Sequence, residues 1–238
     1  MNTHTRVRGR VIGRVLVAWL TVSGGGLAVA AEPLHGAQGG TGAAGQTNAA
    51  SDPAPQPVLG AHARYHHILT GTREVVTGTL STGERGRTVL AEVNRGRGWK
   101  RAVRASTKAG GRFTLAWRPR SLGRYGVRVV LDSRTAKRNV RGGLIVYRRS
   151  YVSWYGPGFY GHRTACGRTL SPHTLGVANK HLRCGTKVTL RYGRRMVTVP
   201  VIDRGPYVAG REYDLTAATR NRLHFGSTGT LWSAPNTR

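Results

Sequence analysis

Short alternating runs of apolar and polar residues, separated by turn residues, fill the chain from about residue 63 to residue 148. Many positions between the apolar ones are Arg, Lys or Thr, as expected for strands with one face in solvent. Six runs at intervals of about 8 to 15 residues are typical of a small antiparallel sandwich. We therefore expect a β-sandwich over residues 63–149, with strands near residues 74–80, 88–93, 99–105, 112–117, 125–131 and 144–147.

Residues 150–238 continue the strand-like alternation but contain one helical segment. That helix is predicted over residues 214–223, with Asp214 as its N-cap and Gly226 just beyond its end. A mostly β segment with a single short helix indicates a small closed barrel, so the predicted fold class is all-β. The barrel strands are expected near residues 151–155, 187–190, 196–202 and 229–232.

The first 62 residues have a different pattern. Four arginines precede a short apolar stretch, and small residues follow it, which predicts a secretory signal peptide over residues 1–31. An uncleaved anchor is the alternative. No Cys lies near the cleavage site, so we expect no lipid anchor and no stable membrane anchor after cleavage. Residues 32–62 contain almost no large apolar side chain and are predicted to form a disordered linker.

Charge narrows the classes of function. The chain has 38 Lys plus Arg against 9 Asp plus Glu, a net charge of +29. So few acids argue against a calcium or di-metal site, and we expect no metal and no cofactor. The arginines are spread through every segment, which partly fits a GC-rich source, but a diffuse positive field still attracts nucleic acid or anionic wall polymers. Predicted export argues against nucleic acid.

The predicted sandwich carries no catalytic arrangement. It resembles the immunoglobulin-like or fibronectin-like modules that secreted bacterial proteins carry as spacers. Its acids, Glu74, Glu84, Glu92 and Asp132, are interpreted as surface strand and turn residues. We expect a spacer or binding module.

Both cysteines, Cys166 and Cys184, lie in the predicted barrel. In an exported chain such a pair is most simply a disulfide, which stabilises by about 3 kcal/mol. A metal site and a reactive thiol are the alternatives. The nearby histidines do not stand at zinc-finger spacing from these cysteines, namely His162, His173 and His181.

A series of motifs in the last segment resembles a known family. The motifs are Ser153-Trp154-Tyr155-Gly156-Pro157-Gly158, Thr164-Ala165-Cys166-Gly167, Gly176-Val177-Ala178-Asn179-Lys180, Cys184-Gly185-Thr186, Val201-Ile202-Asp203-Arg204-Gly205-Pro206-Tyr207 and Tyr213-Asp214-Leu215-Thr216. In this order, over about 85 residues, they resemble the rare lipoprotein A (RlpA-like) family, here a secreted bacterial member of actinobacterial type. The resemblance implies a six-stranded double-psi β-barrel related to the barrel of expansins.

The resemblance also implies a substrate, peptidoglycan. Characterised bacterial members are lytic transglycosylases that cut between N-acetylmuramic acid (MurNAc) and N-acetylglucosamine (GlcNAc), leaving a 1,6-anhydro product. Expansin-like relatives bind and loosen walls without cutting. We therefore expect a secreted, wall-associated protein that acts on glycan strands, either as a lyase or as a non-catalytic binding module.

Cleavage needs a carboxyl group at the leaving oxygen. The barrel has three acids, and Asp203, which ends an apolar strand, is the predicted acid/base. Its alternative role is a turn cap with Arg204 as ion-pair partner. Asp214 is interpreted first as a helix N-cap, a role that accounts for it without any chemistry, and Glu212 as a surface residue beside Arg211.

Two positions depart from the family. Where catalytic members carry a Glu and a His, this chain has Arg168 and Asn179, and His181 lies two residues further on. These departures favour the non-catalytic alternative. Trp154 and Tyr155 are adjacent, so one of them is expected inside the barrel. The predicted substrate-binding residues are Trp154, Tyr155, Arg168, Asn179, His181, Arg204, Tyr207 and Asp214.

Overall fold

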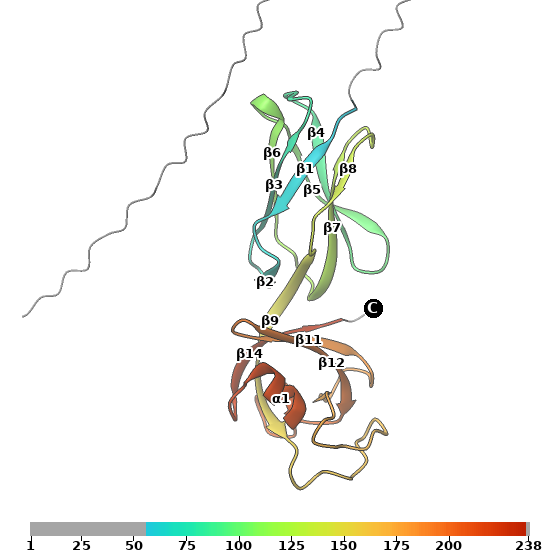
Figure 1. Ribbon diagram of the computed structural model, residues 1–238, viewed down its shortest axis with the longest axis vertical. Coiled ribbons are helices and arrows are strands. Elements are labelled where there is room, and N and C mark those ends of the chain that lie inside the picture. The colour runs from blue at the N-terminus through green and yellow to red at the C-terminus, as the bar shows by residue number, and fades with distance from the viewer. Residues whose placement is uncertain (1–55, 237–238) are drawn as a thin grey trace, which may run out of the picture. The chain divides into compact units, whose positions relative to one another are not determined.

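The computed structural model describes residues 56–236, so the predicted signal peptide and most of the predicted linker lie outside the described residues. The N-terminal part of this range forms two sheets, which Figure 1 shows, and buried residues from both sheets form one apolar core. One sheet has the order β1-β3-β6, made of β1 (Leu59–Ala63), β3 (Glu74–Leu80) and β6 (Arg112–Trp117). The other contains β4 (Thr88–Asn94), β5 (Trp99–Ser106), β7 (Gly123–Leu131) and β8 (Lys137–Asn139). The predicted β-sandwich is confirmed.

Alternate residues of these strands fill the sandwich core. Val76, Leu115, Val89 and Val129 are fully buried and come from both sheets. A single 3₁₀ turn, η1 (Ala109–Gly111), leads into β6. Buried positions alternate in β3 and β6, whereas residues 89–92 of β4 are all buried.

Two acids of the sandwich are buried, contrary to the prediction that all four are surface residues. Glu92 is 5% exposed, and its carboxylate accepts a hydrogen bond from Arg128 Nε at 2.7 Å. Glu74 is 1% exposed; one oxygen accepts from Tyr65 N–H, while the other has no partner among the described residues. Burial raises the pKa of Glu74. Neighbouring strands and loops cover these positions, which local alternation cannot reveal.

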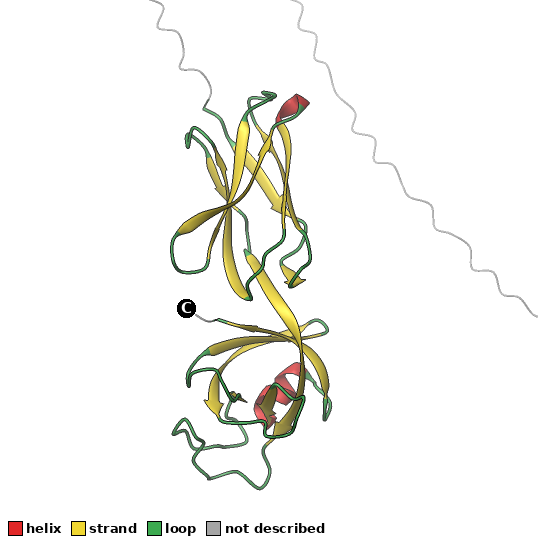
Figure 2. Ribbon diagram, turned by 180° about the vertical axis from the view of Figure 1, so that it is seen from behind, coloured by secondary structure: helices red, strands yellow, loops and turns green. Residues whose placement is uncertain are grey.

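The C-terminal part forms a closed barrel of six strands, seen from both sides in Figures 1 and 2. The ring runs β13-β10-β12-β11-β14-β9 and closes through the parallel pair β13–β9. A second parallel pair joins β10 and β12. The predicted closed barrel with one helix is confirmed. Its strands are β9 (Leu144–Tyr155), β10 (Val177–Ala178), β11 (Lys187–Tyr192), β12 (Arg195–Asp203), β13 (Tyr213–Thr216) and β14 (Gly229–Pro235).

Strand β9 belongs to both parts. Its first residues pair with β7 and with the short strand β2 (His67–Leu69), and its later residues pair with β14 and β13. It therefore crosses the predicted boundary between residues 149 and 150 without a break. At the N-terminal boundary of the predicted sandwich, β1 begins at Leu59, inside the segment predicted as linker. The division at residues 63 and 150 stays a prediction.

The helix is shorter than predicted. Helix α1 spans Ala217–Leu223, and its N-cap is Thr216, whose side chain accepts from Thr219 N–H. Asp214 lies instead in β13, because residues 213–216 pair with β10 and β9. His224, not Gly226, ends the helix in the left-handed conformation. Among the described residues, no helix is both long and apolar enough to cross a membrane.

Candidate active site

The two aspartates of the barrel lie in one row across neighbouring strands. Ala178 on β10 pairs with Asp203 on β12 and, on its other side, with Asp214 on β13. The row continues to Ser153 on β9. Two strand spacings separate Asp203 from Asp214, about 10 Å between their Cα atoms. Residues far apart in the chain thus bring two carboxylates to one side of the barrel.

Backbone donors hold the carboxylate of Asp203. Its Oδ1 accepts hydrogen bonds from Ala165 N and Arg204 N, both at 2.8 Å. No ion pair forms between Asp203 and Arg204, because the guanidinium donates to the carbonyls of Asn179 and Leu182 at 3.0 and 2.9 Å. The turn-cap role is present, but the expected ion pair is wrong.

The hydroxyl of Tyr155 lies beside both carboxylates. Its Oη is buried. Burial, and then the negative charges of Asp203 and Asp214, raise the pKa of Tyr155 well above its ordinary value. The phenol therefore stays protonated at neutral pH and can donate a hydrogen bond. Its neighbour Trp154 packs against the barrel core and lies under Arg220, whose guanidinium carbon is 4.4 Å from the ring centroid.

Two further side chains hold Asp214. Ser153 Oγ donates to Asp214 Oδ1, and Arg211 donates to Ser153 Oγ at 3.0 Å. Neither Ser153 nor Arg211 was predicted as a site residue. Both were hidden from sequence reasoning because only the register of β9 on β13 places Ser153 opposite Asp214.

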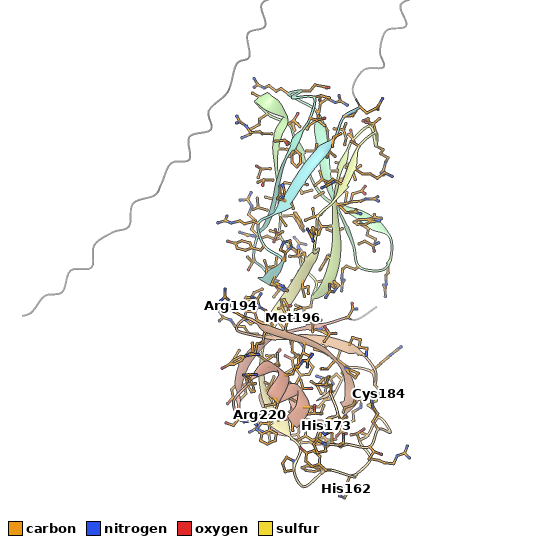
Figure 3. The ribbon with its side chains drawn as sticks, in the orientation of Figure 1. His162, His173, Cys184, Arg194, Met196 and Arg220 are labelled. Carbon is orange, nitrogen blue, oxygen red and sulfur yellow. A yellow bond between two sulfur atoms is a disulfide. The ribbon has the colours of Figure 1, made fainter. Side chains whose placement is uncertain are left out.

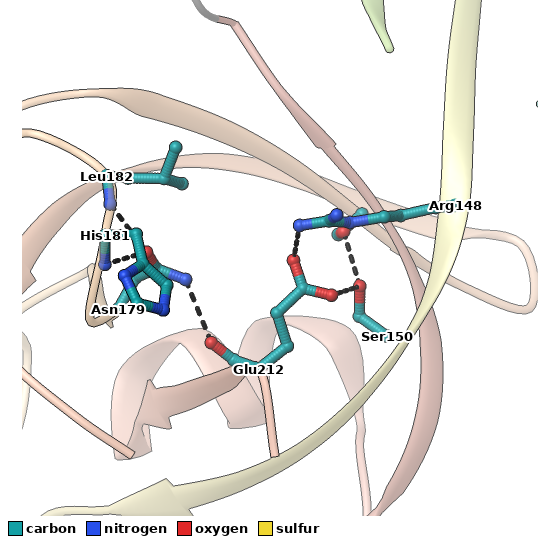
Figure 4. A network of polar contacts seen from close by, with 7 residues as sticks. Arg148, Ser150, Asn179, His181, Leu182 and Glu212 are labelled. Carbon is teal, nitrogen blue, oxygen red and sulfur yellow. Dashed lines mark hydrogen bonds and ion pairs between the residues drawn. The ribbon is translucent and has the colours of Figure 1, made fainter. Parts of the chain in front are cut away.

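Asn179 is buried and fixes the backbone. Its amide donates to the Glu212 carbonyl at 2.9 Å and accepts from His181 N and Leu182 N at 3.0 and 2.8 Å, as Figure 4 shows. Its polar atoms thus already have partners within the chain. The His181 side chain is exposed on the following loop.

Glu212 is not a simple surface residue, contrary to the prediction. Its carboxylate accepts from Ser150 Oγ at 2.6 Å and forms an ion pair with Arg148, which ties the segment before β13 to β9 (Figure 4). The third acid of the barrel is therefore engaged in structure, away from the pair that flanks Tyr155.

The remaining predicted binding residues lie on loops. Tyr207 follows the Asp203 turn and is 81% exposed, with Lys180 Nζ 5.9 Å from its ring centroid. Arg168 is exposed beside Ser171 and His173 rather than in contact with Asp203.

The predicted disulfide is confirmed and supports the site. Cys166 and Cys184 are bonded, with their Cα atoms 5.7 Å apart. Cys166 follows Ala165, whose N–H holds Asp203. Arg204 also donates to Cys184 Sγ, at 3.3 Å. The bond thus joins the two loops that border the aspartate; Figure 3 labels Cys184.

Comparison with known proteins gives one family for this part of the chain. Residues 148–231 match the family described as lytic transglycolase. A probable endolytic peptidoglycan transglycosylase RlpA of Aquifex aeolicus is 42% identical over 80 residues, covering 32% of this chain and 35% of the relative. Endolytic peptidoglycan transglycosylase RlpA of Campylobacter jejuni is 42% identical over 81 residues, covering 33% and 30%.

These matches cover only part of each protein. The chain spans about a third of the length of the curated relatives it matches. Among solved structures, Streptomyces papain inhibitor (SPI) is 21% identical, with a TM-score of 0.30, covering 37% of this chain and 92% of that one. Residues 148–231 are thus similar in sequence to the RlpA-like transglycosylases, and they form the closed six-stranded ring described above.

Proposed function

We propose that this protein acts on peptidoglycan glycan strands as an RlpA-like lytic transglycosylase that cleaves MurNAc–GlcNAc bonds, with Asp203 as acid/base. One observation carries the proposal. Asp203 and Asp214 lie in one row, and the protonated hydroxyl of Tyr155 lies beside both. The names of the relatives support the same substrate.

The reaction needs one carboxyl group that acts twice. Asp203 in its protonated form gives its proton to the GlcNAc oxygen as the bond from that oxygen to MurNAc C1 breaks. The C6 hydroxyl of MurNAc then attacks C1 and returns its proton to Asp203, so no water is consumed. Asp214, whose orientation Ser153 and Arg211 fix, is placed to stabilise the positive charge that develops on the sugar ring.

The predicted binding residues divide by role. The exposed ring of Tyr207 and the hydroxyl of Tyr155 are suited to contact sugar. Asn179 and Arg204 shape the loops around Asp203, because their side chains bind backbone carbonyls and N–H groups. Trp154, Arg168 and His181 remain candidates for outer contacts.

A non-catalytic wall-binding or wall-loosening module is the second candidate. It is favoured by Arg168 and Asn179, which stand where catalytic relatives carry Glu and His. In this case Asp203 would serve only as the turn cap that its two backbone hydrogen bonds describe.

Export and partners belong to the same proposal. Relatives that act on peptidoglycan support a location outside the cytoplasmic membrane, where the predicted signal peptide would direct the chain. The net charge of +29 would hold the protein near anionic wall polymers.

Release of anhydro products tests the proposal. The oxidised protein would be incubated with intact and with peptide-stripped peptidoglycan, and released fragments analysed by mass spectrometry. We expect 1,6-anhydro fragments that disappear in Asp203→Asn and persist in Asp132→Asn, a matched change at an exposed acid of the sandwich. Sedimentation with the wall without any released product would leave the binding module as the function.

A further inference from the structure

Three hollows on the barrel share lining residues, and together they are called the groove below. The first is bordered by residues 181–187 and by Asn236. The second shares Lys187 with the first, and it shares His173 and Leu175 with the third. Their volumes, about 620, 450 and 760 Å³, are within the range of ligand sites. Because lining residues are shared, the three hollows can hold one extended chain.

Strand β12 gives the groove its direction. Met196, Thr198 and Pro200 stand at alternate positions of β12; Met196 lines the third hollow, and the other two line the second. Alternate positions of a strand share a face. Figure 3 labels three of the lining residues. His173 and Met196 line the third hollow, His173 also lines the second, and Cys184 lines the first. Asp203 lines none of these three hollows.

All charged side chains along the groove are basic. The permanent cations are Arg168, Arg183, Lys187, Arg195 and Arg222, and neither Asp nor Glu lines the three hollows. Within residues 56–236, these five side chains donate no hydrogen bond and form no ion pair. Their donors therefore face solvent and can bind an anion. Guanidinium groups suit phosphate oxygens, which they can bind through two parallel hydrogen bonds.

The lining also argues against other polymers. No Phe, Tyr or Trp lines the three hollows. Single-stranded nucleic acids and neutral glycans both gain much of their affinity by stacking on such rings. An anionic polymer that has no bases can bind this lining through charge contacts alone.

We propose that this groove binds a phosphodiester-linked anionic polymer of the cell wall. Asp203 does not line the groove, whereas Arg168 and His181, which are also candidates for outer glycan contacts, do. From the proposed function the inference takes only that the protein meets the wall. It does not require that glycan is cleaved. An experiment can therefore overturn the polymer site without overturning the proposed cleavage of glycan, and the reverse.

Binding of the full chain to poly(glycerol phosphate) tests the groove. The test variant is Lys187→Gln/Arg195→Gln/Arg222→Gln, and the matched control removes three exposed charges of the sandwich, Arg104→Gln/Arg118→Gln/Arg120→Gln. If each lost contact contributes about 0.7 to the slope of log K against log salt, three contacts give about 2, or about a hundredfold in affinity at 0.1 M salt. The groove variant should lose this much, and the control less than about threefold.

Three outcomes would overturn the site. Equal losses in both triple variants would show a diffuse field rather than a groove. Tighter binding of DNA than of poly(glycerol phosphate), lost in the groove variant, would make it a nucleic-acid site. Absence of polymer binding by the unchanged chain would also end the proposal. Asp203→Asn should keep full polymer affinity, which separates this result from a failure of catalysis.

Discussion

The hydroxyl of Tyr155 is buried beside two carboxylates. Burial and the charges of Asp203 and Asp214 raise the pKa of this hydroxyl, so it stays protonated and can donate a hydrogen bond in the proposed reaction.

Tyr155→Phe should separate activity from stability. We expect release of anhydro products to fall by about tenfold to a hundredfold, because a donor to the reacting groups is lost. Thermal unfolding should shift upward or stay unchanged. The control is Tyr213→Phe, which removes a second buried hydroxyl, with a pKa raised by burial to about 12, away from the aspartate pair. Equal activity losses in both variants would contradict the assigned role of Tyr155.

Glu74 gives a pH-dependent prediction in the sandwich. Since its folded pKa is raised, its contribution to stability is present below the unfolded pKa and is lost as pH rises through the folded value. At pH 7 the buried charge therefore destabilises the fold. Glu74→Gln should raise the free energy of unfolding at pH 7 by roughly 1 kcal/mol, and the gain should vanish near pH 4. Denaturant melts at both pH values measure it, and a gain that is independent of pH would contradict it.

At the scale of elements, the disulfide links two loops rather than two strands. Cys166 and Cys184 border the turn that follows β12, and Ala165 N–H on the first loop holds Asp203. The disulfide therefore restricts the conformations of the unfolded chain, and in the folded chain it holds the loop that binds Asp203.

Cys166→Ser/Cys184→Ser should lower the free energy of unfolding by about 3 kcal/mol, the loop-closure value for a separation of 18 residues. Product release should fall further than the folded fraction does, because the loop that holds Asp203 is loosened. Melts and product assays of the oxidised, reduced and double-Ser proteins measure both effects. An active, equally stable reduced protein would show that the bond is dispensable.

At the scale of the whole molecule, charge is present in every described part. Most cationic side chains have no acid partner, since the described residues hold only four ion pairs. The sandwich shares this property with the barrel, so retention on the wall should be partly electrostatic.

Salt should therefore release the protein from isolated walls. At about 1 M salt, where the screening length is about 3 Å, we expect most bound protein to leave walls that carry anionic polymers. Walls stripped of these polymers should retain less protein at low salt. Pelleting that stays the same across the whole salt range would assign retention to uncharged glycan contacts.

The sequence by itself predicted the all-β class, the closed barrel and the disulfide, and it contains the motifs that resemble the RlpA-like family. These predictions depend on local patterns that can be recognised without a structure, namely strand alternation, the Cys pair and the Asp203-Arg204-Gly205-Pro206 motif. It also identified Asp203 as the candidate acid. These features depend on residues that are close in the chain or on motifs in a fixed order.

Only the tertiary structure decided how the acids are used. Asp214 fits a helix N-cap by local pattern, but pairing with β10 and β9 places it in a strand opposite Ser153. Glu212 gains its partner Ser150 from a segment 62 residues away in the chain, and Glu74 is buried on a strand that pairs with residues 112–117. The physical reason is that strand register and burial arise from non-local contacts, which neither alternation nor spacing encodes.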